Sequence, residues 1–186
     1  LRSVATIVAA QMRVKDSLMC RLLLTSAQDK TTRMEPTLAP FDELLQWLPE
    51  QRVHWSEQKR QAHASDETED LVFIPDVVVE PANVQEVSAV MAWAHRHRIP
   101  VTPAGARTGL SGGALPVCGG MALSLCRMNR ILAIDTLNHQ AIVEPGVITE
   151  ELSNAAAQHG LLYAVDPASR GTCTIGGNLA ENSGGP

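Results

Sequence analysis

The sequence is poor in the residue patterns that build disulfide frameworks and metal sites. Its cysteines are widely separated and form no C-x-x-C pair: Cys20, Cys118, Cys126 and Cys173. Its six histidines include no H-E-x-x-H motif, and His95 and His97 lie two positions apart, on different faces of a helix. These absences argue against a structural zinc site and against a secreted, disulfide-bonded protein. We therefore expect reduced thiols, no metal site and a cytoplasmic location.

An excess of basic residues and a long apolar run are also missing. The formal net charge is −5, which argues against a nucleic acid partner. The opening segment, Leu1 to Met34, is interrupted by charged residues and is too short and broken to span a bilayer. It has a faint likeness to a transit peptide, and a non-native extension is the alternative. The 186 residues, 45% of them apolar, can still bury a core in one domain or two small ones.

Two common phosphate motifs are absent as well. No Gly-Lys-Ser/Thr is present for a P-loop, and the spacing G-x-G-x-x-G of a Rossmann turn does not occur. A different glycine-rich stretch runs from Pro103 to Pro116 and contains Gly105, Gly109, Gly112 and Gly113. Glycines let the backbone turn its amides towards an anion, so we expect a diphosphate-binding loop. Arg107 would add positive charge, and Thr108 and Ser111 would add hydroxyl donors. A flexible surface loop is the alternative.

The residues before this loop predict a strand, a helix and a second strand. A short lead-in helix is expected over 41–48, followed by a polar connector over 52–70 with a solvated acidic cluster. Val77–Val79 predicts a strand, and a helix begins at Asn83, with Glu86 completing a capping box. A brief strand at 101–102 then leads into the glycine loop. This βαβ order favours parallel strands and places the loop at their carboxyl edge, where α/β sheets bind ligands.

Beyond the loop, the pattern predicts a strand, a hairpin and a helix. The strand covers 121–125, and the hairpin pairs 131–135 with 141–144. The helix is expected to be capped by Thr149 and to end at Gly160. The order of elements predicts an α+β, or α/β layered, fold.

The final stretch, from Asp166 to Pro186, is a second segment rich in glycine, hydroxyl and amide groups. Together with the first loop it could hold a cofactor, one segment binding a diphosphate and the other approaching the polar edge of a planar ring. A disordered tail is the alternative.

The two segments resemble those of the FAD-linked oxidase family. The resemblance rests on P-A-G-A-R-T-G-L-S-G-G-A at 103–114, D-P-A-S at 166–169, T-I-G-G-N at 174–178 and N-S-G-G at 182–185, and it extends over 37–186. The most similar branch is the glycolate oxidase catalytic subunit and D-lactate dehydrogenase group. The resemblance implies an FAD-binding domain of the vanillyl-alcohol oxidase type, truncated, with lead-in elements over 37–70, the domain over 71–186 and an extension over 1–36.

The resemblance also implies the cofactor-binding residues. Those around the FAD pyrophosphate are Pro103, Gly105, Arg107, Thr108, Gly109, Leu110, Ser111 and Gly112. Those on the flavin and ribityl side are Pro167, Ser169, Cys173, Thr174, Gly176, Gly177, Asn178 and Asn182. Because the first loop holds no histidine for a covalent link, we expect non-covalent FAD.

By the same resemblance, the full protein oxidises a D-2-hydroxy acid such as glycolate or D-lactate by hydride transfer to flavin N5. Family members continue into a substrate domain with the catalytic base, so no catalytic residue is assigned here. The alternatives are an inactive fragment, a partner-binding module, or an enzyme of the same superfamily with another substrate. The electron acceptor, further subunits and peripheral membrane contact stay open.

Overall fold

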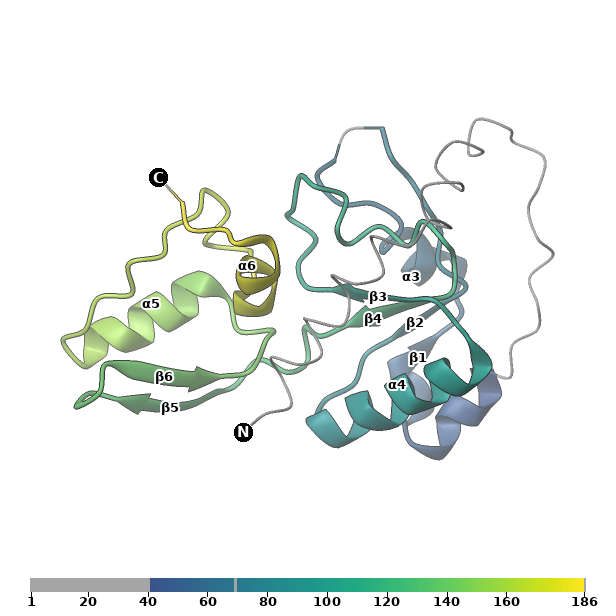
Figure 1. Cartoon of the computed structure of the whole chain (residues 1–186), viewed down its shortest axis with the longest axis horizontal. Helices are drawn as coiled ribbons and strands as arrows, with labels where there is room; N and C mark the ends of the chain where they lie inside the picture. The colour runs from purple at the N-terminus through teal and green to yellow at the C-terminus, as the bar shows by residue number, and fades with distance from the viewer. Residues whose placement is uncertain (1–40, 69, 186) are drawn as a thin grey trace. The chain divides into compact units, whose positions relative to one another are not determined.

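A computed structural model describes residues 41–68 and 70–185, and from Pro40 to Pro186 the chain forms one compact unit. Figure 1 shows a mixed arrangement of helices and two sheets, which confirms the predicted fold class. The extension expected over 1–36 lies outside the described residues.

The larger sheet has the order β1-β2-β4-β3 and consists of three parallel strands and the antiparallel edge strand β1 (Val53–His54). Strand β2 (Val77–Val79) and β3 (Val101–Ala104) both run parallel to β4 (Met121–Ser124), which lies between them. The predicted βαβ unit is therefore confirmed, although its two strands are not direct neighbours. Every residue of β2 and β4 is buried, as expected of parallel strands covered on both faces.

The helix of this βαβ unit is α4 (Val84–His97), and its start matches the sequence pattern. The Asn83 side chain accepts a hydrogen bond from the Glu86 N–H at 2.9 Å, and the Glu86 carboxylate accepts one from the Ala82 N–H at 2.8 Å. The helix ends because Arg98 adopts the left-handed conformation, with φ of 55°.

One buried residue that holds α4 in place was not predicted. Trp93 is fully buried, and its indole N–H donates to Glu43 Oε2 at 2.9 Å. Its ring also contacts Phe41, at a centroid distance of 5.6 Å. Trp93 and Glu43 are 50 positions apart in sequence, so no local pattern indicates this contact.

The predicted connector over 52–70 contains regular structure that the sequence pattern did not indicate. It includes β1 (Val53–His54), which pairs antiparallel with β2, and the helix α3 (Glu57–Gln61), capped by Ser56. The short 3₁₀-helix η2 (Glu50–Arg52) precedes them. The lead-in helix is also 3₁₀, as η1 (Phe41–Gln46). Elements this short show no hydrophobic periodicity in the sequence. Pairing of β1 with β2 in the sheet stabilises this segment instead.

The second sheet is the predicted hairpin, formed by β5 (Ile131–Asp135) and β6 (Gln140–Val143). Residues from α5 (Thr149–Gln158) and α6 (Ile175–Glu181) complete its small apolar core. The predicted cap at Thr149 is wrong: Ile148 occupies the N-cap position, and Thr149 is the first helical residue. Its hydroxyl instead donates to the Cys173 carbonyl at 3.3 Å, because the two segments pack together.

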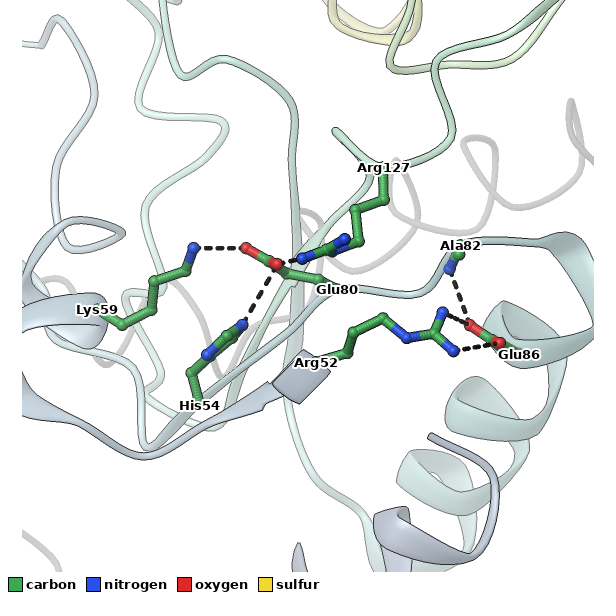
Figure 2. A network of polar contacts seen from close by, with 7 residues as sticks. All are labelled: Arg52, His54, Lys59, Glu80, Ala82, Glu86 and Arg127. Atoms are coloured by element: carbon green, nitrogen blue, oxygen red, sulfur yellow. Dashed lines mark hydrogen bonds and ion pairs between the residues drawn. The ribbon is translucent and has the colours of Figure 1, made fainter. Parts of the chain in front are cut away.

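A buried carboxylate follows β2 at the same sheet edge from which the glycine loop leaves. Glu80 contacts Lys59 at 2.6 Å, Arg127 at 3.0 Å and His54 at 3.3 Å, as Figure 2 shows. Burial by itself would raise the pKa of Glu80, but the hydrogen bonds from these three residues outweigh it and lower the pKa from 4.5 to about 2. Glu80 thus ties α3 and the segment after β4 to the end of β2.

The substitution Glu80→Gln is expected to lower the free energy of unfolding at neutral pH by about 1–3 kcal/mol, because charged hydrogen bonds are lost. A carboxylate with a lowered folded pKa stabilises the protein above its unfolded pKa and loses this effect as the pH falls towards the folded value. Wild-type stability should therefore decline between pH 4.5 and about 2, more steeply than in the variant. Denaturant unfolding across this range checks the difference, with the exposed Glu50→Gln as control. Parallel pH profiles would contradict the role of Glu80.

Candidate cofactor site

The glycine loop leaves β3 at the carboxyl edge of the parallel sheet, as the sequence predicts. Two of its residues have positive φ: Arg107 at 59° and Gly112 at 73°. Side chains rarely adopt this conformation, so glycine at 112 suits the turn, whereas Arg107 must be held there by its surroundings. The loop therefore has a defined backbone conformation at these two positions. Pro103 lies within β3, the strand that leads into the loop.

The backbone amides of this loop meet no acceptor among residues 41–68 and 70–185. From Ala106 to Ala114, no N–H donates a hydrogen bond to any residue in the described part of the chain. Within that same part, Arg107 has no ion-pair partner. A run of free N–H groups beside an unpaired guanidinium is the donor set that an anion requires.

The centre of the second segment is the helix α6, which the sequence analysis did not predict. Gly176, Gly177 and Asn178 are helical, Thr174 is the N-cap, and Asn182 ends the helix in the left-handed conformation with φ of 54°. Two glycines in a short stretch gave no helical signal, since glycine disfavours helices. Here tertiary packing requires glycine: a Cβ on Gly176 would lie 2.7 Å from that of Pro145.

Tertiary structure brings the two segments together at two points. A Cβ added to Gly105 would overlap the Thr174 hydroxyl, so the loop backbone passes directly against the start of α6. At the other end of the helix, the Ser111 hydroxyl donates to Glu181 Oε2 at 2.5 Å. The predicted pairing of the segments in space is confirmed.

Several predicted residues of the second segment are buried inside the protein. Asn178 donates its amide N–H to the Thr149 hydroxyl at 2.6 Å, and this hydroxyl lies 3.2 Å from Cys173 Sγ. Pro167 is buried as well, and the Ser169 carbonyl accepts hydrogen bonds from the next turn. The contacts of Asn178 and Cys173 with Thr149 fix α6 against α5. The part of all these residues in binding a cofactor stays a prediction.

Sequence reasoning missed the segment 63–68, which packs against the glycine loop. The Glu67 N–H donates to the Gly109 carbonyl at 3.2 Å, and Asp66, expected to be solvated, has a buried carboxylate oxygen without a partner. Burial lowers the pKa of His63, and the positive charge of Arg107 lowers it further. At neutral pH this lowered pKa favours the uncharged form of His63. The polar sequence around His63 carries no pattern that indicates the contact of this segment with the glycine loop.

Sequence comparison gives the family. The profile of the FAD binding domain family matches residues 75–186, which includes both segments. The chain belongs to the FAD binding domain family. It is 40% identical over 144 residues to the glycolate oxidase subunit GlcD of Bacillus subtilis, covering 77% of this chain and 31% of the relative. It is 45% identical over 111 residues to a D-lactate dehydrogenase of Anaerostipes hadrus, covering 60% of this chain and 23% of the relative.

Among solved structures, alkyldihydroxyacetonephosphate synthase matches with a TM-score of 0.71 and 24% identity, over 77% of this chain and 31% of that one. This likeness supports the fold alone. The chain spans less than a third of the length of the curated relatives described above.

FAD is the cofactor of this family, and the donor set of the glycine loop fits its diphosphate. Free backbone N–H groups and one guanidinium bind phosphate oxygens without a metal ion. In the described ranges, no three His, Cys, Asp or Glu side chains gather as metal ligands. No helix within 41–68 or 70–185 is both long and apolar enough to cross a membrane.

We expect Gly105→Ala to destabilise the protein by about 1–3 kcal/mol, because the new methyl group would force Thr174 to move and break the cap of α6. The unfolding midpoint in denaturant measures this loss. Gly109→Ala is the matched control, since a Cβ there meets nothing within 4 Å. Equal midpoints for the two variants would show that the close approach is unimportant.

Proposed function

We propose that this chain binds FAD non-covalently, with the diphosphate on the loop 105–112 and the flavin side towards α6. The observation that supports this most is the meeting of the two segments at Gly105 and Thr174, because it places the free amides of the loop beside the second segment. When bound, FAD would supply a hydride acceptor for an oxidoreductase.

The chain's own residues would contribute binding and orientation. The amides of 106–112 would donate to the diphosphate oxygens, and Arg107 would neutralise part of the charge. The α6 segment would border the ring side, held rigid by the contacts of Thr149 with Cys173 and Asn178. A rigid scaffold favours binding, since less conformational entropy is lost when the ligand arrives.

The substrate proposed for the whole protein is a D-2-hydroxy acid of the glycolate or D-lactate type. Its support is the relatives' names, which include glycolate oxidase and D-lactate dehydrogenase. The catalytic base and the groups that bind the substrate carboxylate are not assigned to any residue of this chain. Its proposed part in the reaction is to hold and orient the cofactor.

FAD titration of the purified chain tests the cofactor proposal. Quenching of flavin fluorescence should be saturable, and Arg107→Ala should weaken the affinity about 10- to 100-fold, as expected for a lost charge-assisted contact with phosphate. Arg96→Ala removes an exposed arginine from α4 and serves as control. Absence of saturable quenching in the wild type, or equal affinities for all three proteins, would overturn the proposal.

A reduction assay tests the substrate class and uses the protein at its natural length. Under anaerobic conditions, glycolate or D-lactate should bleach the visible flavin band, because hydride transfer consumes the oxidised cofactor. L-lactate, which has the same atoms in the opposite configuration, is the control and should react much more slowly. Bleaching by neither glycolate nor D-lactate would contradict the substrate assignment while leaving FAD binding intact.

A further inference from the structure

The helix α6 contacts the glycine loop at both of its ends. Thr174, at the start of the helix, lies against Gly105, and Glu181, its last residue, accepts the hydrogen bond from the Ser111 hydroxyl. Ser111 and Glu181 are 70 positions apart in sequence. The part of the loop with the free amides therefore runs between two fixed points.

The loop backbone leaves space for the Glu181 carboxylate. A Cβ on Gly113 would overlap Glu181 Oε1, so the absence of a side chain at 113 lets the carboxylate lie against the backbone. Both carboxylate oxygens thus have a place on the loop, one beside Gly113 and one on the Ser111 hydroxyl. Two independent features, a donor and a gap, accommodate the same side chain.

The contact bears on the role of Ser111. A hydroxyl has one proton to donate, and in this structure Ser111 donates it to Glu181. Ser111 therefore cannot also donate to a phosphate oxygen while this hydrogen bond lasts. Its role in this arrangement is to hold the loop.

We propose that Ser111 and Glu181 form a clasp that positions the glycine loop for FAD. This inference rests on the proposed function, and both residues act through the loop backbone. The clasp holds the amides between Gly105 and Gly113 in their binding arrangement before the cofactor arrives, which reduces the ordering that binding requires. The carboxylate charge opposes this by repelling the diphosphate. Because Glu181 is exposed, water screens that repulsion, and the gain from ordering outweighs it.

Affinities of four variants of the full chain test the clasp. Ser111→Ala and Glu181→Ala should each weaken FAD binding about 3- to 10-fold, within the range of one hydrogen bond, and the double variant should be no weaker than either. Glu181→Gln keeps an acceptor oxygen and should retain most of the affinity. The controls are Ser183→Ala and Glu151→Ala, whose side chains make no hydrogen bond or ion pair with a described residue. Effects that multiply in the double variant, or a loss of affinity in Glu181→Gln as large as that in Glu181→Ala, would overturn the clasp.

Hydrogen exchange without FAD supplies a readout that is independent of the cofactor. The amides of Glu67 and Leu115, which donate to the loop carbonyls of Gly109 and Gly112, should exchange faster in Ser111→Ala and Glu181→Ala than in the wild type, while those of α4 should be unchanged. Unchanged exchange of these two amides would reject the clasp. If the wild type binds no FAD but their exchange responds as expected, the proposed function fails and the clasp stands. If Arg107→Ala weakens binding but the clasp variants do not, only the clasp fails.

Discussion

The approach of Gly105 to Thr174 is the contact on which the rest of the site depends. Thr174 is almost fully buried and has two tasks, since its hydroxyl caps α6 and also lies against the loop backbone. Only glycine leaves room for this arrangement. The contact joins the glycine loop, which follows the parallel sheet, to the helix α6, which packs with the hairpin. It therefore connects the two sheets' structural elements at the candidate cofactor site.

The position of the loop follows from the sheet. Three parallel strands end at the same edge, and the glycine loop leaves this edge from β3. Glu80 fixes the end of the neighbouring β2 by holding cationic side chains from α3 and from the segment after β4, as seen in Figure 2. Charge is thus balanced locally at the sheet edge. The free amides and Arg107 can present donors to an anion on a chain whose net charge is −5.

Sequence patterns predicted the elements whose signals are local. The cap at Asn83, the β-branched run of β2 and the alternation of the hairpin each depend on a few neighbouring residues, and each was confirmed. Signals failed where a partner distant in sequence decides the outcome. Thr149 looked like a cap but binds the Cys173 segment, and Gly176 lies within the helix α6 because Pro145 leaves no room for a side chain there.

The sequence by itself determined the fold class, the parallel βαβ unit, the glycine loop and, through the resemblance, the family and its cofactor FAD. These follow from residue types at fixed spacing, which act over a few positions. Only the tertiary structure decided that the second segment is a helix, that it contacts the first loop at both ends and that Glu181 holds Ser111. Such contacts join residues about 70 positions apart, and the spacing of residues along the chain carries no record of which of them will meet.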